Sequence, residues 1–146
     1  MLKKSMLKTK QSIDYLNFEI NCGRSLKHPH VLGIEFVIQR DFEIILVLKY
    51  LPGKDLQYQL DQKMIKDIHY MVPEPVIIFW AYQMLLGIKY LHSKKYVHRD
   101  FKLSNTLMSE LCNIMICDFG MTTKLEKGQS LRDRCGTPHY MAPEQA

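Results

Sequence analysis

The sequence contains few cysteines, and none of them stands close to another. Its four cysteines, Cys22, Cys112, Cys117 and Cys135, form no C-x-x-C motif. This spacing argues against a disulfide scaffold and against a thiolate metal site. We therefore expect reduced thiols that are buried in the protein interior.

The chain also lacks a long apolar run, internal repeats and segments of low complexity. Its most apolar stretch, PVIIFWAYQMLLGIKYL, is interrupted by Gln83 and Lys89, and the basic N-terminus precedes no apolar segment of the signal-peptide type. We therefore expect no membrane partner, and a cytoplasmic or nuclear location.

Basic residues outnumber acidic ones, but they are not concentrated. The formal net charge is +5, and the lysines and arginines are scattered along the chain rather than interleaved with aromatic residues. Nucleic-acid binding would require a basic patch on one face. It is therefore the least favoured of three functional interpretations, and no nucleic-acid partner is expected.

What is present is the composition of a globular domain. The chain has 146 residues, of which 47% are hydrophobic and 24% are charged, and this suffices for one modest core. Apolar spacing predicts an amphipathic helix over residues 12–26, with Ser12 as its cap. The runs IEFVIQ and FEIILVLKY, joined by Arg40 and Asp41, predict an antiparallel hairpin, and LPGKDL predicts a turn.

A longer helix is predicted over residues 75–92, where Pro75 is tolerated in the first turn. The spacing places five residues on its core-facing side: Ile78, Ala81, Leu85, Ile88 and His92. Short strands are predicted at TLM and NIMIC, and no regular period follows them.

Charged and polar residues gather in YVHRDFKLSNTLM, residues 96–108, directly after that helix. HRD alone could belong to a solvated turn. HRDFKLSN as a whole, followed by DFG with Asp118 thirteen positions after Asn105, does not arise by chance in a chain of this length. Because loops on a rigid scaffold commonly carry catalytic residues, we interpret this segment as part of an active site.

These motifs resemble the central part of a eukaryotic protein kinase. HRDFKLSN resembles the catalytic loop, DFG the metal-binding loop, and CGTPHYMAPE the end of the activation segment. The resemblance implies an α+β, two-lobed fold that is truncated, with residues 1–50 as the remainder of the small lobe and residues 51–146 as the first half of the large lobe. The glycine-rich loop, the strand with the ATP-anchoring lysine and the C-terminal helices of the large lobe would lie outside this sequence.

The resemblance implies the catalytic roles. Asp100 would accept the proton of a substrate hydroxyl, Lys102 would neutralise the transferring phosphoryl group, and Asn105 and Asp118 would hold Mg²⁺ against the phosphates of ATP. These residue types suit phosphoryl transfer, which needs positioning, oxygen ligands for a hard cation and positive charge near the phosphate. Arg99 would offer its guanidinium group to an anion on the activation segment.

The resemblance also implies a nucleotide site. Glu19 would pair with the anchoring lysine, although a solvated helical glutamate is the alternative interpretation. Leu48 would be the gatekeeper and Leu107 would pack beneath the adenine ring. The backbone of Lys49, Tyr50 and Leu51 would face adenine.

Two further matches indicate the substrate class. Lys102, two positions after Asp100, and Gly136-Thr137-Pro138 resemble the serine/threonine pattern, which implies transfer of the ATP γ-phosphate to serine or threonine of a protein substrate. Met121 after DFG favours serine. HPHVL, VPEP, KLSN and CGTPHYMAPE together most resemble polo-like kinases.

Some residues depart from the family pattern. Asp133 stands where related kinases carry a phosphorylatable threonine, and it is either an exposed loop acid or a fixed negative charge for Arg99. Ser130 is an alternative phosphosite, and Thr137 is a further candidate regulatory residue. Gly23 replaces a larger side chain that would contact Phe119, so we expect a gap and a loosely coupled Glu19 helix that needs an activating protein partner.

Two functional classes remain open. The complete catalytic set favours a serine/threonine kinase whose sequence is incomplete, whereas the missing lysine and glycine-rich loop favour a catalytically silent, kinase-like binding or regulatory module. By itself the chain is expected to be marginally stable and nearly inactive, and to expose a large apolar patch around residues 75–92.

Overall fold

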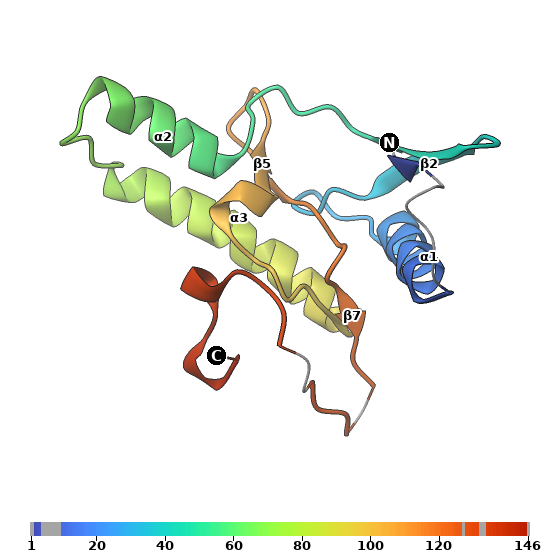
Figure 1. Ribbon diagram of the computed structural model, residues 1–146. Helices are drawn as coiled ribbons and strands as arrows, with labels where there is room; N and C mark the ends of the chain where they lie inside the picture. Colours follow the sequence, from blue (N-terminus) through green and yellow to red (C-terminus); the bar gives the residue numbers. More distant parts are fainter. Residues whose placement is uncertain (1, 4–9, 127, 132–133, 146) are drawn as a thin grey trace.

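The computed structural model describes residues 2–3, 10–126, 128–131 and 134–145. Two groups of elements lie on opposite sides of the molecule (Figure 1), with α1 and a small sheet on one side and the helices α2 and α3 on the other. Short strands and loops connect the two groups, in agreement with the predicted α+β class.

The N-terminal group combines one helix with an antiparallel sheet. α1 spans Lys10–Ser25, β2 spans Ile34–Gln39 and β3 spans Glu43–Leu48, so the predicted helix and hairpin are confirmed. β1, Leu2–Lys3, pairs with β3 and gives the strand order β1-β3-β2, a third strand that was not predicted. Because α1 begins at Lys10, Ser12 lies inside the helix and the predicted cap is wrong.

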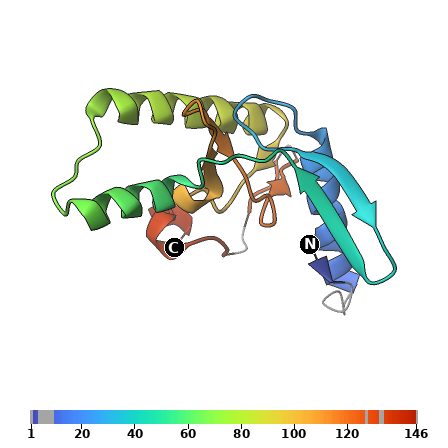
Figure 2. The same cartoon turned by 90° about the horizontal axis from the view of Figure 1, so that it is seen from above.

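The second group consists of two helices that run side by side (Figure 2). α3, Glu74–Ser93, confirms the predicted long helix, whereas α2, Leu56–Lys66, was not predicted. α2 begins where it does because the Asp55 carboxylate accepts a hydrogen bond from the Tyr58 backbone N–H at 2.8 Å, which satisfies a free donor of the first turn.

The predicted core face of α3 is wrong. Ile78, Ala81, Leu85 and His92 are exposed, and only Ile88 of that set packs against the core. The buried residues of α3 are Gln83, Gly87 and Leu91. Apolar spacing could not select this face because most positions of the helix are apolar. The buried face is determined by two contacts with the backbone of other segments. At Gly87 the chain passes so close to the loop before β2 that a Cβ would lie 2.7 Å from the carbonyl oxygen of His30. Gln83 Oε1 accepts a hydrogen bond from the Ile114 N–H at 2.8 Å.

Two small antiparallel strand pairs lie between the groups. β5, Thr106–Met108, pairs with β6, Ile114–Ile116, as predicted for TLM and NIMIC. β4, Tyr96–Val97, pairs with β7, Thr123–Lys124, which was not predicted. Single 3₁₀ turns occur at Leu103–Asn105, Pro138–Tyr140 and Pro143–Gln145. The predicted turn at LPGKDL is confirmed, and the Gly53 N–H donates to the Met108 carbonyl at 3.0 Å.

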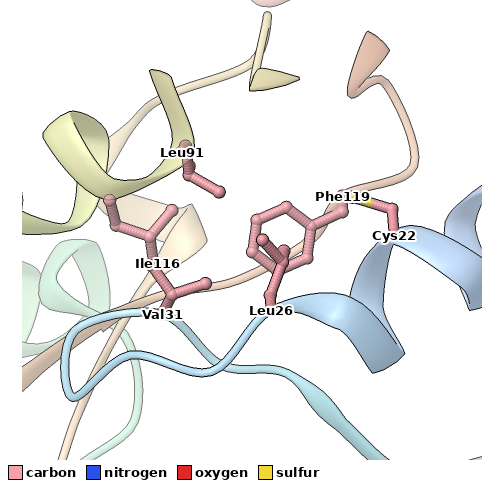
Figure 3. Close-up of a cluster of buried hydrophobic side chains, with 6 residues drawn as sticks. All are labelled: Cys22, Leu26, Val31, Leu91, Ile116 and Phe119. Atoms are coloured by element: carbon pink, nitrogen blue, oxygen red, sulfur yellow. The ribbon is translucent and has the colours of Figure 1, made fainter. Parts of the chain in front are cut away.

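One buried cluster joins the two groups (Figure 3). It consists of Cys22 from α1, Leu26 directly after α1, Val31, Leu91 from α3, Ile116 from β6, and Phe119. A second cluster, formed by Leu56, Met108 and Ile114, fixes α2 against β5 and β6. Phe119 of DFG therefore belongs to the same core as α1.

Gly23 does not leave the gap that the sequence predicted. A Cβ built on Gly23 would lie 2.6 Å from Ile34 Cδ1 and 2.7 Å from Ile34 Cγ1. The side chain of Ile34 therefore occupies the space, and Cys22 and Leu26 link α1 to Phe119. The expectation of a loosely coupled helix is wrong at the level of side-chain contacts.

The four cysteines are free, but their burial varies. Cys22 is buried, Cys117 and Cys135 are partly buried, and Cys112 is exposed. The prediction of buried thiols thus holds fully for Cys22 and fails for Cys112, which lies in the turn between β5 and β6. Within the described residues, no helix combines the length and apolar character needed to cross a membrane.

The predicted apolar patch is present and is larger than α3 alone. Ile65, Ile68 and Met71, which lie at the end of α2 and in the following loop, are 77%, 79% and 84% exposed, and Ile78 and Leu85 extend the exposed apolar residues along α3. We refer to these five residues as the α2–α3 apolar surface.

Candidate active site

Asp100 lies at the centre of a hydrogen-bond network. Its Oδ2 forms an ion pair with Lys102 Nζ at 2.8 Å and accepts a hydrogen bond from Asn105 Nδ2 at 3.1 Å. Its Oδ1 accepts a hydrogen bond from Thr137 Oγ1 at 2.7 Å. Lys102 Nζ also donates to Thr137 Oγ1 at 2.8 Å. Four of the residues singled out in the sequence therefore meet in one cluster.

A tight turn brings these side chains together. The chain forms one 3₁₀ turn over Leu103–Asn105, in which the Asn105 N–H donates to the Lys102 carbonyl at 3.0 Å. Thr106 Oγ1 donates to the same carbonyl at 2.8 Å. Asn105 Nδ2 reaches back to the Asp100 carbonyl at 2.8 Å. The turn is thus fixed at both of its ends.

The Asp100 carboxylate is buried but remains in its charged form. Burial by itself acts to raise the pKa of Asp100, but hydrogen bonds from Lys102, Thr137 and Asn105 and the charge of Lys102 outweigh it, and the pKa lies below its ordinary value of 3.8. At neutral pH Asp100 is therefore an oriented anion that can accept a proton or a hydrogen bond.

His98 orients the backbone that carries Asp100. Its Nδ1 accepts a hydrogen bond from the Asp100 N–H at 3.3 Å, which leaves the proton on Nε2 to be donated to the Cys117 carbonyl at 3.0 Å. Burial lowers the pKa of His98, which favours this neutral tautomer. The His98 ring also meets the Phe119 ring edge-on, with centroids 5.5 Å apart.

Asp118 directly follows Cys117, and its carboxylate is exposed. The Cys117 N–H donates to the Asn105 carbonyl at 3.0 Å, so the residue before Asp118 is tied to the turn that carries Asn105. Asp118 has φ +65°, a left-handed conformation in which aspartate is enriched and which recurs at functional sites. Its Oδ1 accepts a hydrogen bond from the Gly120 N–H at 3.3 Å.

Glu19 of α1 belongs to the same region. It is partly buried, and burial raises its pKa, to which the negative charge of Asp118 adds. In the part of the chain that the structure describes, neither carboxylate forms an ion pair. The carboxylates of Glu19 and Asp118 therefore share a region of negative potential.

Arg99 directly precedes Asp100 in the chain. It has φ +66°, and its Nε donates to the Met121 carbonyl at 2.7 Å, directly after DFG. Asp133, the anion considered for it, lies outside the described residues. Ser130 is exposed, whereas the Thr137 hydroxyl is engaged by Asp100 and Lys102.

A cavity of about 710 Å³ opens between β3 and β5. The five residues predicted around adenine, Leu48, Lys49, Tyr50, Leu51 and Leu107, all line it. Among the other lining residues are Lys54, Asp55 and Cys117, which the sequence did not single out as site residues. Asp55 also caps α2, a helix that the sequence did not predict. Burial raises the pKa of Cys117 to about 12, with contributions from the charges of Asp118 and Asp55, so this thiol stays protonated.

The oxygen donors of the site suit a hard divalent cation. In the described residues, no group of three or more His, Cys, Asp or Glu side chains could hold a metal. Asn105 uses its amide nitrogen for Asp100, so its amide oxygen remains a candidate ligand, and the Cys117 N–H bond to the Asn105 carbonyl ties this turn to the residue before Asp118. Mg²⁺ commonly binds through one or two such ligands and completes its shell with water and phosphate oxygens, so these residues fit Mg²⁺ bound together with a nucleotide.

Comparison with known proteins identifies relatives over the whole chain. The family model for the protein kinase domain matches residues 1–146. The chain is 34% identical over 99% of its length to the serine/threonine-protein kinase PLK1 of Xenopus tropicalis, covering 23% of that protein. It is 32% identical over 97% of its length to the probable serine/threonine-protein kinase CCRP1 of Zea mays, covering 22% of that protein.

A third relative belongs to another kinase group. The chain is 36% identical over 86% of its length to sucrose non-fermenting protein kinase 1 of Fusarium virguliforme, covering 17% of that protein. Polo-like and SNF1-like kinases are thus both represented among the relatives. The chain spans only 17% to 23% of the length of these three relatives.

Proposed function

Because this chain belongs to the protein kinase family, we propose that it is part of a serine/threonine kinase that transfers the γ-phosphate of ATP to a hydroxyl group of a protein substrate. The observation that carries the proposal is the buried Asp100 carboxylate, which is kept ionised by Lys102, Asn105 and Thr137.

Asp100 is the proposed acceptor of the substrate hydroxyl proton. Phosphoryl transfer depends mainly on positioning and electrostatics, and each oxygen of Asp100 is held by a different donor. The Asp100 carboxylate is therefore a weak base, and its proposed contribution is the fixed orientation of its oxygens toward the substrate hydroxyl. Lys102, which already contacts Asp100, carries the positive charge that would neutralise the transferred phosphoryl group.

The nucleotide is proposed to bind in the cavity between β3 and β5. Leucine side chains at positions 48, 51 and 107 offer an apolar surface for a planar base, and the backbone of residues 49–51 borders the same space. When bound, ATP with Mg²⁺ supplies the transferable phosphoryl group. Asn105 and Asp118 would hold the metal, and Glu19, whose carboxylate interacts electrostatically with Asp118, would receive a cationic side chain.

The serine/threonine class rests on the contact between Lys102 and Thr137. Lys102 Nζ donates a hydrogen bond to Thr137 Oγ1 at 2.8 Å. The two sequence matches to the serine/threonine pattern therefore belong to one site, which supports a common role in substrate binding. Arg99 is proposed to bind an anion on the segment that follows Met121, with Ser130 and Asp133 as the candidate sources of charge.

The direct test is phosphate transfer by the protein expressed from its natural gene. Wild type and Asp100→Asn are incubated with radiolabelled ATP, Mg²⁺ and peptides that contain serine, threonine or tyrosine. Transfer to serine and threonine is expected, and Asp100→Asn should lower its rate by about 10²–10⁴-fold. Asp14→Asn, on the exposed side of α1, is the control.

Equal transfer by wild type and Asp100→Asn would contradict the proposal, as would transfer to tyrosine. Absence of transfer by a folded wild-type protein would favour the alternative, a catalytically silent kinase-like module.

A further inference from the structure

A second cavity, of about 540 Å³, lies between the end of α1, the loop that follows it and the start of β2. Four basic or titratable side chains line it: Arg24, Lys27, His28 and Lys49. Glu35 is the one acidic residue among the lining residues. In the described part of the chain, neither Arg24, Lys27 nor Lys49 takes part in an ion pair. The cavity therefore carries uncompensated positive charge.

The rim of this basic cavity is held in place by α3. The Lys27 N–H donates to the Tyr90 hydroxyl at 2.9 Å, and the His28 ring stacks on the Tyr90 ring with centroids 4.8 Å apart. The His30 N–H donates to His28 Nδ1 at 3.1 Å. A rim that is ordered before binding loses little conformational entropy when a ligand arrives.

Apolar side chains form much of the remaining lining of the basic cavity. Its lining includes Leu26, Val31, Ile34, Phe36 and Met115. Phe36 is 65% exposed although it is a large aromatic residue. A ligand that complements this cavity therefore needs an apolar group for the apolar part of the lining and negative charge for the rim, which a bare inorganic anion does not provide.

The cavity is also bordered by an open sheet edge. In the strand order β1-β3-β2, β2 has no partner on its outer side among the described strands (Figure 2). Alternate residues of such a strand direct their backbone N–H and C=O groups outward, where an extended peptide can pair with them. Ile34, Glu35 and Phe36 belong both to this strand and to the cavity lining.

We propose that the basic cavity binds an extended, acidic peptide segment of a partner protein. The segment pairs with the outer edge of β2, inserts an aromatic or aliphatic side chain beside Phe36, and places carboxylates near Arg24, Lys27 and Lys49. The sheet edge and the apolar part of the lining favour a peptide over a nucleic acid, whose phosphates would engage only the rim. Peptide binding by itself does not depend on the proposed kinase activity.

The location of the basic cavity gives such a partner a route to the proposed nucleotide site. Leu32 and Lys49 line both this cavity and the cavity between β3 and β5. A peptide that fixes the conformation of Lys49 and of the start of β2 would change the lining of both cavities. This consequence, unlike the binding itself, rests on the proposed function.

Fluorescence anisotropy with defined probes tests the binding. The probe is a fluorescein-labelled peptide of sequence EDEFEIEDE, compared with its uncharged amide analogue QNQFQIQNQ and with EDEAEAEDE, which lacks the apolar side chains. The protein variants are Arg24→Gln/Lys27→Gln and, as a matched control with the same change in charge, Lys66→Gln/Lys89→Gln on α2 and α3. Circular dichroism verifies that each variant is folded.

The charged peptide with Phe and Ile should bind, and both altered peptides should bind more weakly. Arg24→Gln/Lys27→Gln should weaken binding by about tenfold, as expected for two partly exposed charge pairs, whereas the control pair should have little effect. Glu35→Gln should strengthen binding, because it removes the one acid of the lining.

Three results would overturn the proposal. The first is equal affinity for the charged and amide peptides. The second is an equal loss of affinity in the Arg24/Lys27 and Lys66/Lys89 variants. The third is binding of a labelled 20-nucleotide RNA that depends on Arg24 and Lys27 while the acidic peptide does not bind, since this would make the basic cavity a nucleic-acid site.

Discussion

At the scale of single residues, the two oxygens of Asp100 have separate partners. Oδ2 is paired with Lys102 and Asn105, and Oδ1 with Thr137. The motif HRDFKLSN singled out Asp100, Lys102 and Asn105 together, but it did not predict their contacts with one another. The contact with Thr137 could not be predicted either, since it joins residues 37 positions apart and depends on how the chain returns after β7.

The Thr137 hydroxyl is expected to lower the pKa of Asp100. A hydrogen bond to the charged form favours that form, so Thr137→Ala should raise the Asp100 pKa, whereas Thr137→Ser should leave it nearly unchanged. NMR titration of the ¹³C-labelled Asp100 carboxyl group measures this directly. Equal pKa values in the alanine and serine variants would show that the hydroxyl does not act on Asp100.

The same pKa determines how Asp100 contributes to stability. Its folded-state pKa lies below the ordinary value of 3.8, so its stabilising contribution is present in full well above that value. The contribution is lost as the pH falls through the folded-state pKa. Removal of the Thr137 hydroxyl should make the contribution smaller without changing its sign.

At the scale of elements, α1 and β2 fit together through Gly23 and Ile34. The sequence showed correctly that Gly23 is unusual, but it could not show which side chain fills the space, because Ile34 lies on another element. A similar limit applies to α3. Its existence follows from apolar content and Pro75, whereas its buried face is determined by the contacts of Gly87 and Gln83 with segments distant in sequence.

The contact between Gly23 and Ile34 predicts a sign change in a double-mutant cycle. Gly23→Ala alone should destabilise the protein by about 1–3 kcal/mol, because the new Cβ overlaps Ile34. In an Ile34→Ala background the overlap is removed, and the same change should be neutral or stabilise by up to about 1 kcal/mol through helix propensity.

Urea unfolding of the four proteins in this cycle provides the free energies. If Gly23→Ala has the same effect in both backgrounds, Ile34 does not fill the space beside Gly23. The original expectation of a gap would then be restored.

At the scale of the whole molecule, the active-site candidates lie between two groups of elements that share the core of Figure 3. The hairpin could be predicted from local pattern, whereas the α+β fold class and the candidate residues Asp100, Lys102, Asn105 and Asp118 followed from the resemblance to protein kinases. α2, β1 and the β4–β7 pair could not be predicted, because their sequences carry little periodicity and their pairing is set by distant segments.

The α2–α3 apolar surface is a second property of the whole molecule. An exposed apolar patch around residues 75–92 was expected because the resemblance implied that the segments that would bury this helix lie outside the sequence, but its extension to Ile65, Ile68 and Met71 was not expected. Exposed apolar area of this kind favours association with other surfaces. The binding experiments above should therefore use a low protein concentration, at which the protein does not associate with itself through this surface.

The most direct test of the proposed nucleotide site is the effect of Mg²⁺ on ATP affinity, measured by isothermal titration calorimetry. Asp118→Asn removes the charge while keeping a residue that tolerates the left-handed backbone of this position, and Asp14→Asn is the control. Mg²⁺ should tighten ATP binding to wild type and to Asp14→Asn, and this gain should disappear in Asp118→Asn. ATP binding that is indifferent to Mg²⁺, or a gain that persists in Asp118→Asn, would contradict the assignment of Asp118 and of the site as a whole.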